Sequence, residues 1–305
     1  FSTFGAKNKI QRVIKYLFSL IQLFFYLINN TEKNEPILMY HSVILSIPIR
    51  LAKYLKKFKL ILEVEEIYQD AQSLSLLMRK NEYMLFEAAD KYLFSTELLN
   101  ERINEESKPR AILYGTYHVE ELRGGSFDNQ KIHVVYAGTF DQRKGGALAA
   151  VNAAAFLTSK YHMHIIGFGT KKDLTFLLQR INEISEKNNV TISYDGLLKG
   201  EEYIQFLQKC DIGLSTQTPD GIYNETSFPS KILSFMSNGL RVVSIRLKVI
   251  EYSSIGKNIY YYDRQDPKQI AKVIQSVDLS KEFDSRKLVQ SLDKKFVKDI
   301  GLLLK

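Results

Sequence analysis

The stretch VVYAGTFDQRKGGALAA, residues 134–150, decides the fold of this chain. An apolar run typical of a buried strand leads into a polar turn with three glycines, and an alanine-rich helical pattern follows. Glycine lets the backbone approach a ligand, and the free N–H groups at a helix start favour an anion. Arg143 and Lys144 add positive charge there. The segment predicts a strand–turn–helix unit that binds a diphosphate, although a tight turn with solvent-facing bases would have the same pattern.

From Ile132 onward, short apolar runs alternate with helical patterns at the spacing of βαβ units, which is typical of a parallel sheet covered on both faces. We therefore predict a doubly wound lobe over residues 130–282. The expected strands are 132–137, 163–167, 190–193, 212–215 and 241–245, and the expected helices are 147–159, 171–187, 201–209 and 231–237.

The first half of the chain repeats this alternation less completely. It predicts a Rossmann-like lobe over residues 1–125 whose opening strands we expect to precede Phe1. Turn residues cluster without apolar periodicity at 124–129, which predicts the hinge between the lobes. A final amphipathic helix within 283–305 is expected to pack back on the first lobe. The expected strands of this half are 37–40, 60–64, 92–95 and 111–114, with helices at 51–57 and 77–88.

Two further turns of the second lobe repeat the phosphate chemistry. Gly167 and Gly169 close the expected strand that follows the opening one. Ser230 stands at the mouth of a predicted helix, and Lys231 lies in its first turn, where a cation opposes the helix dipole. An anionic ligand explains that lysine better than helix stability does. Three such turns in one lobe predict a nucleotide site.

The composition is that of a folded protein, with 45% hydrophobic and 25% charged residues. The single cysteine, Cys210, excludes an internal disulfide and a multi-cysteine metal site. The net charge of +8 lies entirely in residues 1–60, which hold ten bases and two acids. This basic half fits an anionic membrane surface, or a solvated face around core helices. Nucleic acid is not expected as a partner, because no nucleic-acid module is present.

The most apolar stretch of the chain is residues 13–28. It is shorter than the roughly 20 residues that a bilayer-spanning helix needs, and it contains Lys15. We therefore expect it not to span a membrane. No secretory signal pattern precedes the fold. The expected location is cytoplasmic, at the inner face of the cell membrane as a peripheral protein.

Four segments follow one another in the second half of the chain: VVYAGTFDQRKGG, HIIGFGTKKDL, ISYDGLLKGEEYIQFLQKCDIGLS and SFPSKILSFMSNGLRVVS. Taken in order, they resemble the donor-binding lobe of retaining GT-B glycosyltransferases of bacterial surface-polysaccharide biosynthesis, the glycosyl transferases group 1 type. In the first half, ILEVEEIYQD, AADKYLFSTELLNERI and ILYGTYH are similar to the acceptor lobe of that family. The resemblance implies an α/β fold of GT-B type, with two Rossmann-like doubly wound lobes facing a cleft and an incomplete N-terminal lobe.

The resemblance also assigns donor-binding residues. Lys144 matches the lysine that contacts the donor diphosphate, with Arg143 beside it as a second candidate. Gly138 matches the glycine that gives the phosphates room, and Ser230 with Lys231 the helix start that binds the distal phosphate. The remaining positions are Gly167 and Gly169 near the nucleoside and Gly196 beside the base.

The sequence departs from the family at several positions. Thr139 stands where the family often has an arginine. The family commonly has two glutamates eight residues apart, and the second of them holds the ribose hydroxyls; Thr226 and Ser234 occupy these positions here. Glu225, one residue from the first position, is a candidate substitute, and Ser234 bonds ribose more weakly than a carboxylate.

An acidic motif closes an expected strand of the first lobe, where α/β sheets place their ligands. It contains Glu63, Glu65 and Glu66 and matches a strand-end motif that faces the cleft in the family, although such glutamates can also be solvent contacts. Glu65 is the residue of this motif that we expect to act in catalysis.

Together these features predict a hexosyltransferase-type enzyme without cofactors. It would move a sugar from a UDP- or GDP-sugar to a glycan or polyprenyl-linked acceptor, with retention of configuration. No Asp-x-Asp motif occurs, so no metal ligand is assigned, and basic residues are expected to stabilise the leaving diphosphate.

Three alternatives compete with this prediction. The first is a non-catalytic GT-B scaffold subunit of a glycosyltransferase complex, which Ser234 favours. The second is a peripheral membrane adaptor built on the basic first lobe. The third, a nicotinamide-dependent oxidoreductase, is disfavoured because the G-x-G-x-x-G opening is missing.

Overall fold

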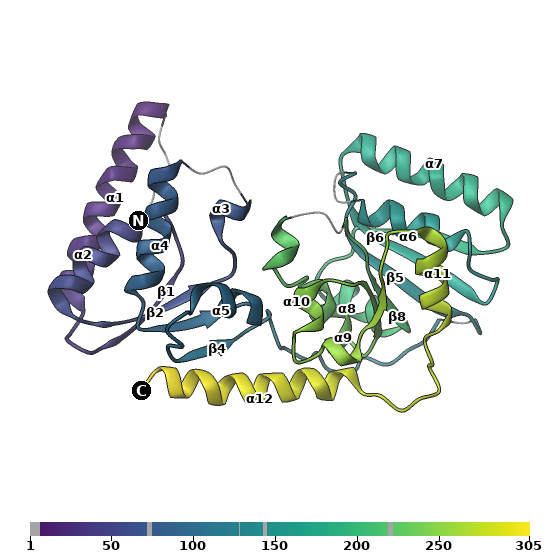
Figure 1. The fold of residues 1–305 in the computed structure, drawn as a ribbon. Coiled ribbons are helices and arrows are strands. Elements are labelled where there is room, and N and C mark those ends of the chain that lie inside the picture. Colours follow the sequence, from purple (N-terminus) through teal and green to yellow (C-terminus); the bar gives the residue numbers. More distant parts are fainter. Residues whose placement is uncertain (1–6, 72–74, 128, 143–144, 219–221) are drawn as a thin grey trace. The chain divides into compact units, whose positions relative to one another are not determined.

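The computed structural model describes residues 7–71, 75–127, 129–142, 145–218 and 222–305. The chain forms two compact units (Figure 1). The first unit comprises Phe1–Leu113 and Phe296–Lys305, and the second comprises Tyr114–Lys295. The change of unit at Leu113 lies before the turn-rich segment 124–129, which belongs to the second unit.

The first unit is built on a parallel sheet of four strands in the order β1-β2-β3-β4. Its core gathers aliphatic and aromatic side chains such as Ile49, Leu62 and Phe94 around β2 and β3. The strands are β1 (Pro36–Tyr40), β2 (Lys59–Val64), β3 (Lys91–Phe94) and β4 (Arg110–Ile112), and the helices are α1 (Lys9–Asn30), α2 (Ser46–Lys56), α3 (Tyr68–Ala71), α4 (Leu76–Ala88) and α5 (Glu97–Ile103).

The helix α1 begins after Asn8, whose side chain accepts a hydrogen bond from the backbone N–H of Gln11. It has 22 residues, and by length and composition it is able to cross a membrane. The stretch 13–28, expected to be too short to span a membrane, is only part of this helix, which extends from Lys9 to Asn30. Only Leu23 and Leu27 are buried in α1, and they join the core of the first unit.

The second unit is a parallel sheet of six strands in the order β10-β9-β8-β5-β6-β7. Helices α6, α7 and α11 cover one face, and α8 and α9 the other (Figure 1). The strands are β5 (Ile132–Thr139), β6 (Tyr161–Phe168), β7 (Thr191–Gly196), β8 (Ile212–Ser215), β9 (Arg241–Ile245) and β10 (Tyr260–Tyr262). The helices are α6 (Gly146–Ala154), α7 (Lys171–Lys187), α8 (Gly200–Gln208), α9 (Lys231–Ser237), α10 (Lys248–Glu251) and α11 (Pro267–Gln275), with the 3-10 turns η1 (Ile222–Glu225) and η2 (Gly256–Asn258).

Local sequence explains where the main helices of this unit start. Thr170 and Asp173 form a capping box at the start of α7, because each side chain bonds the other's backbone N–H. Asp266 caps α11, and Pro267 takes its first position, where the missing N–H is not needed. The final helix α12 (Ser285–Leu303) ends in the first unit, where Leu303 is buried against Ile61, Leu93 and Ala111.

Candidate functional site

Two glycines, Gly138 and Gly167, are paired one residue before the ends of the neighbouring strands β5 and β6. A Cβ atom on Gly167 would lie 1.8 Å from the carbonyl oxygen of Gly138, so no other residue fits there. A Cβ atom on Gly138 would lie 3.3 Å from Nζ of Lys231. The carboxyl edge of the sheet therefore offers bare backbone next to a cation, at the place where parallel sheets bind ligands.

A pocket of about 220 Å³ opens at this edge of the second sheet. Its volume is below the about 300 Å³ at which small-molecule pockets usually begin, so it fits part of a nucleotide. Phe168 and Leu197 are 56% and 45% exposed and give the pocket apolar walls. Its lining is Ala137, Gly138, Thr139, Ile166, Gly167, Phe168, Leu197, Leu198 and Tyr203.

The side chain of Lys231 lies over a buried aromatic ring. Its Nζ is 4.5 Å from the centroid of Tyr136, a cation–π contact. The Tyr136 hydroxyl donates a hydrogen bond to the carbonyl of Thr139 at 3.1 Å. Tyr136 thus accounts in part for a lysine at the start of α9, which sequence reasoning attributed to an anion alone. The ring also holds the ammonium group beside Gly138.

The loop between β5 and α6 carries the predicted diphosphate residues Arg143 and Lys144, which lie outside the described residues. The described end of this loop is tightly packed. Gly145 has a φ of 62°, a left-handed conformation that suits glycine, and precedes the first residue of α6. A Cβ atom on Gly146 would lie 2.6 Å from the carbonyl oxygen of Thr216. The α6 start is therefore fixed against β8 and Tyr136.

Ser234 stands where the resembled family has a ribose-binding carboxylate. It does not line the pocket itself but contacts a residue that does. Its Oγ is 3.1 Å from the hydroxyl of Tyr203, which lines the pocket. Burial raises the pKa of Tyr203. Ser230 is exposed immediately before α9, and Glu225 is exposed at the end of η1. None of the three serves as pocket lining among the described residues.

Two predicted glycines have a packing or turn role in the structure. A Cβ atom on Gly169 would lie 2.8 Å from Cβ of Phe140, so this glycine lets the turn before α7 pack closely. Gly196 has a φ of 86° at the end of β7, with open space around its Cα. It starts the turn that brings Leu197 and Leu198 into the pocket wall.

Comparisons with known proteins agree with this architecture. Residues 131–277 match the family model of Glycosyl transferases group 1. The structure of Anabaena Alr3699/HepE in complex with UDP aligns with a TM-score of 0.66 at 12% identity, over 94% of this chain and 81% of that one. The apo form of the lipopolysaccharide outer core galactosyltransferase WaaB aligns with a TM-score of 0.62 at 16% identity, over 98% and 82%. A comparison with curated protein sequences finds no match.

The chain has the GT-B fold. The predicted fold class, two Rossmann-like lobes with parallel sheets, is therefore confirmed. The pocket at Gly138 and Gly167 lies inside the region that matches the group 1 family model.

In the first unit of the GT-B fold, the predicted acidic motif spans the end of β2: Glu63 lies on the strand, and Glu65 and Glu66 follow it. The Glu65 carboxylate accepts a hydrogen bond from the hydroxyl of Tyr40 at 3.1 Å. The backbone carbonyl of Glu65 accepts another from the hydroxyl of Ser95. Burial, and then the charge of Glu65, raise the pKa of Glu63. The neighbouring Glu65 carboxylate is exposed. Tyr40 and Ser95 therefore hold Glu65 at the end of the strand.

Sequence reasoning missed several residues of the second unit. Tyr136 and Tyr203 gave no signal, because tyrosines within strand and helix patterns are usual core residues. A cluster of His133, His162 and His164 was also missed, although the spacing of His162 and His164 on one strand places both side chains on the same face. These histidines lie at the amino-terminal half of β5 and β6, away from the glycine edge.

Proposed function

We propose that the protein is a glycosyltransferase that moves a sugar from a nucleotide-sugar donor to a glycan or polyprenyl-linked acceptor. The observation that carries this proposal is the bare backbone of Gly138 and Gly167 beside Lys231, within a region similar to the group 1 glycosyltransferases. Bare backbone admits phosphate oxygens closely, and an ammonium group compensates their charge. The UDP complex of the similar HepE structure supports a UDP-sugar as the donor.

The pocket divides into parts that suit different portions of such a donor. Phe168 and Leu197 present exposed apolar surface on which a base can stack. Gly138, Gly167 and Lys231 suit the diphosphate. We assign Arg143 and Lys144, on the neighbouring loop, to the same diphosphate as catalytic cations. In this proposal basic side chains stabilise the leaving nucleoside diphosphate, and the anomeric configuration of the sugar is retained.

Calorimetric titration of the full chain with UDP and with GDP tests the proposal. We expect UDP to bind at one site per chain and GDP to bind more weakly. Lys144→Ala should then lower turnover roughly a hundredfold, as the loss of an oxyanion donor does. Binding of neither nucleotide would reject the transferase and favour the scaffold alternative. Ser234 favours that alternative. At the position where a carboxylate would hold ribose, it offers only a hydroxyl, which is already hydrogen-bonded to Tyr203.

We assign the acceptor side of the reaction to Glu65 in the first unit. Its exposed carboxylate is positioned by the hydroxyl of Tyr40 and remains able to accept a proton from a sugar hydroxyl. A carboxylate suits a hydroxyl-bearing glycan acceptor better than an anionic one, since like charges repel.

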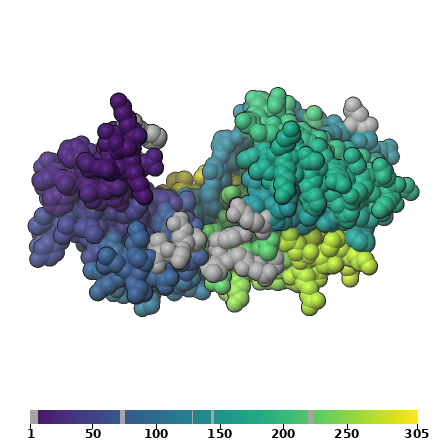
Figure 2. Space-filling model, turned by 90° about the horizontal axis from the view of Figure 1, so that it is seen from above, coloured from purple at the N-terminus to yellow at the C-terminus, as the bar shows by residue number. Residues whose placement is uncertain are grey.

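We further propose that the first unit binds the inner face of the cell membrane as a peripheral protein. Helices α1 and α2 pack together and bury one face of each in the core. The side chains of α1, dark purple in Figure 2, stand at the surface. The large exposed apolar residues of the two helices are Ile10, Val13, Ile14, Leu17, Phe18, Ile21, Phe25, Tyr26, Ile47, Leu51, Tyr54 and Leu55.

Charge complementarity selects an anionic membrane as the occupant of this surface. Lys9, Arg12 and Lys15 lie on α1, and Lys56 lies at the end of α2 next to the exposed Leu55. Each basic residue near an anionic surface contributes about 1 kcal/mol. Apolar side chains between the bases add burial in the interface between headgroups and acyl chains.

Liposome sedimentation tests the membrane proposal. The full chain should sediment with vesicles that contain phosphatidylglycerol and be released by high salt. Arg12→Glu with Lys56→Glu should weaken sedimentation, whereas Lys187→Glu on the second unit should not. Retention after alkaline carbonate extraction would mean that α1 spans the bilayer, and would overturn the peripheral assignment.

A further inference from the structure

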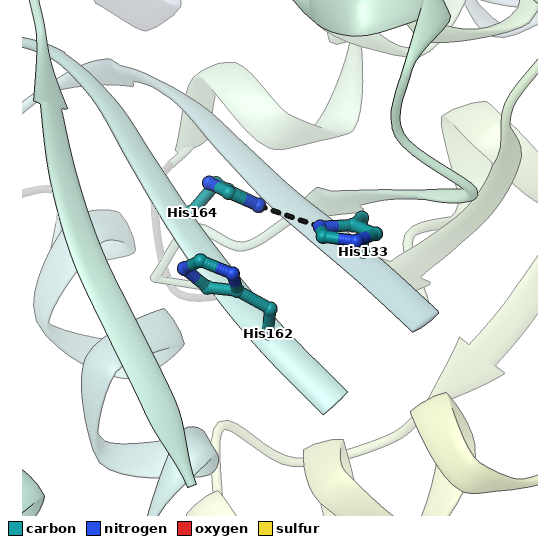
Figure 3. Close-up of side chains that lie close together, drawn as sticks. All are labelled: His133, His162 and His164. Carbon is teal, nitrogen blue, oxygen red and sulfur yellow. Dashed lines mark hydrogen bonds between the residues drawn. The ribbon is translucent and has the colours of Figure 1, made fainter. Parts of the chain in front are cut away.

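Three of the five histidines of the chain gather on one face of the second sheet (Figure 3). His133 on β5 pairs with His162 on β6, and His164 follows two residues later on the same face. One metal-binding nitrogen from each ring lies within 4.8 Å of the others. His133 and His164 are almost fully buried, and His162 is half-buried. Three imidazoles are thus brought together at an interior point of the sheet.

Each ring is oriented by an oxygen atom outside the cluster. An oxygen that accepts from one ring nitrogen places the proton there and leaves the other nitrogen with a lone pair. Ser193 donates to Asp195 at 3.0 Å, so its oxygen is free to accept from His162. This arrangement is the one that orients metal-binding histidines in proteins. The three contacts are His133 Nε2 to Asn129 Oδ1 at 2.9 Å, His162 Nε2 to Ser193 Oγ at 2.9 Å and His164 Nδ1 to Asp195 Oδ2 at 3.0 Å.

The inner nitrogens of the cluster then require a cation. With the outer nitrogens protonated, Nδ1 of His133 and Nε2 of His164 both carry lone pairs and face each other at 2.8 Å, as the dashed line in Figure 3 shows. Two lone pairs at this distance repel unless a proton or a metal ion lies between them. Nδ1 of His162 supplies a third lone pair. A metal ion satisfies all three nitrogens, whereas a proton satisfies only two.

The surroundings of the cluster favour neutral imidazole, which is the form that binds metals. The ring of Phe127 stacks on His133 at 4.1 Å and on His164 at 4.9 Å, which keeps water away from that side.

Charged groups near the cluster act in both directions on a bound cation. The amine of Lys131, which bonds Thr191, opposes it. Two carboxylates favour it: Asp195 beside His164, and Asp211, which accepts from the backbone N–H of His133 at 2.7 Å. The carboxylates outnumber the amine, so the local charge favours a cation.

We infer that His133, His162 and His164 bind one divalent transition-metal ion of the Zn²⁺ class, with water in the fourth position. Three imidazole nitrogens are a common ligand set for such ions. At Zn–N distances of about 2.0–2.1 Å, tetrahedral ligands lie about 3.3 Å apart. Binding therefore widens the His133–His164 contact slightly and draws the half-buried His162 inward.

This site is separate from the proposed donor pocket and does not rest on the proposed function. His133 and Gly138 are five residues apart on β5, or about 16 Å at the rise of a strand. The ion would join β5 to β6. His164 also contacts Asp195 on β7, which lies at the register shift of the β6–β7 pairing, next to Gly196. Its expected role is to stabilise the second sheet.

Titration of the full chain, stripped with EDTA, with Co²⁺ and then Zn²⁺ tests the inference. Co²⁺ should give the visible absorption bands of a tetrahedral site, and one equivalent of Zn²⁺ should abolish them. Saturating Zn²⁺ should raise the melting temperature, because an ion that binds only the folded state stabilises it. Absence of both the absorption bands and the thermal shift would overturn the site.

Variants assign the signal to the cluster. His164→Asn should abolish the Co²⁺ bands, and Asp195→Asn should lower Zn²⁺ affinity about 10- to 100-fold, as the loss of an outer partner does. The control His118→Gln changes an exposed histidine of the same unit and should bind like the wild type. If His164→Asn fails to fold by circular dichroism, His162→Asn, at the half-buried position, replaces it. Unchanged Co²⁺ bands in a folded cluster variant would reject the assignment.

Discussion

Both units have residues of the predicted site at the carboxyl ends of their parallel strands, but the chemistry at the two edges is opposite. In the second unit, Gly138 and Gly167 are paired one residue before the ends of β5 and β6, with the Lys231 ammonium beside Gly138. In the first unit, β2 ends at Val64, and Glu63 and Glu65 present carboxylates next to Tyr40. The same strand geometry thus offers bare backbone and positive charge in one unit and negative charge in the other. This difference teaches that the sheet supplies only the place, whereas the residues at its edge set the charge that a ligand would meet there.

The largest effect should come from closing the glycine edge. Gly167→Ala places a Cβ atom 1.8 Å from the Gly138 carbonyl oxygen, so the strands must separate. We expect a loss of about 3–5 kcal/mol in the free energy of unfolding, measured by urea denaturation. Gly196→Ala is the control, since open space surrounds it and only backbone strain of about 1–2 kcal/mol applies. Equal losses in the two variants would show that packing at Gly167 is not special.

The acidic edge is tested by Glu65→Gln, which keeps the shape but removes the carboxylate base. Turnover should fall roughly a hundredfold, the usual size of a general-base contribution, while UDP affinity stays unchanged. Glu101→Gln, an exposed glutamate in the same unit, should leave both quantities unchanged. A loss of UDP affinity in Glu65→Gln would contradict the division of labour between the two edges. Initial rates and calorimetry measure the two quantities.

The cation of the glycine edge has a smaller expected effect. Lys231→Ala should weaken UDP binding roughly tenfold, about 1.4 kcal/mol, because it removes one charge-assisted contact. Lys187→Ala, which removes an exposed lysine at the end of α7, should bind UDP like the wild type. If both variants bind equally well, Lys231 does not contact the donor.

The smallest expected effect concerns the pH dependence of the first unit. Burial raises the pKa of Glu63 above its unfolded value, so its favourable contribution exists at low pH and is lost as pH rises through the folded pKa. Glu63→Gln should therefore be more stable than the wild type at pH 7, by less than about 1 kcal/mol, and equal to it below about pH 4. Thermal melts across this range measure the difference. A variant that is less stable at pH 7 would show that the Glu63 carboxylate is favourably bound.

The spacing of apolar residues predicted most strands and helices of the two units. The strand 212–215 and the helices 171–187 and 231–237 agree with the structure residue for residue. The short elements α5, α10 and β10 were not predicted, because a few residues carry too little periodic signal. The length of α1 was also missed, since its apolar stretch continues into polar ends that remain helical.

The candidate site was predicted less completely than the fold. Gly138 and Gly167 were predicted from glycines near two strand ends, and the structure adds that they are partners in the β5–β6 register. Gly169, predicted to lie near the nucleoside, also packs closely against Phe140, because a glycine in a turn can serve packing as well as binding. The assignments of these glycines, and of every other predicted donor-binding or catalytic residue, stay predictions.

By itself, the sequence determined the alternation of strands and helices, the glycine turns and the concentration of basic residues in the first 60 positions, because these depend on local composition and period. Only the tertiary structure decided that Lys231 lies over Tyr136, that Tyr203 joins Ser234 to the pocket wall, and that three histidines meet on one face. Such contacts depend on strand register and on the packing of segments far apart in the chain, which no local pattern specifies.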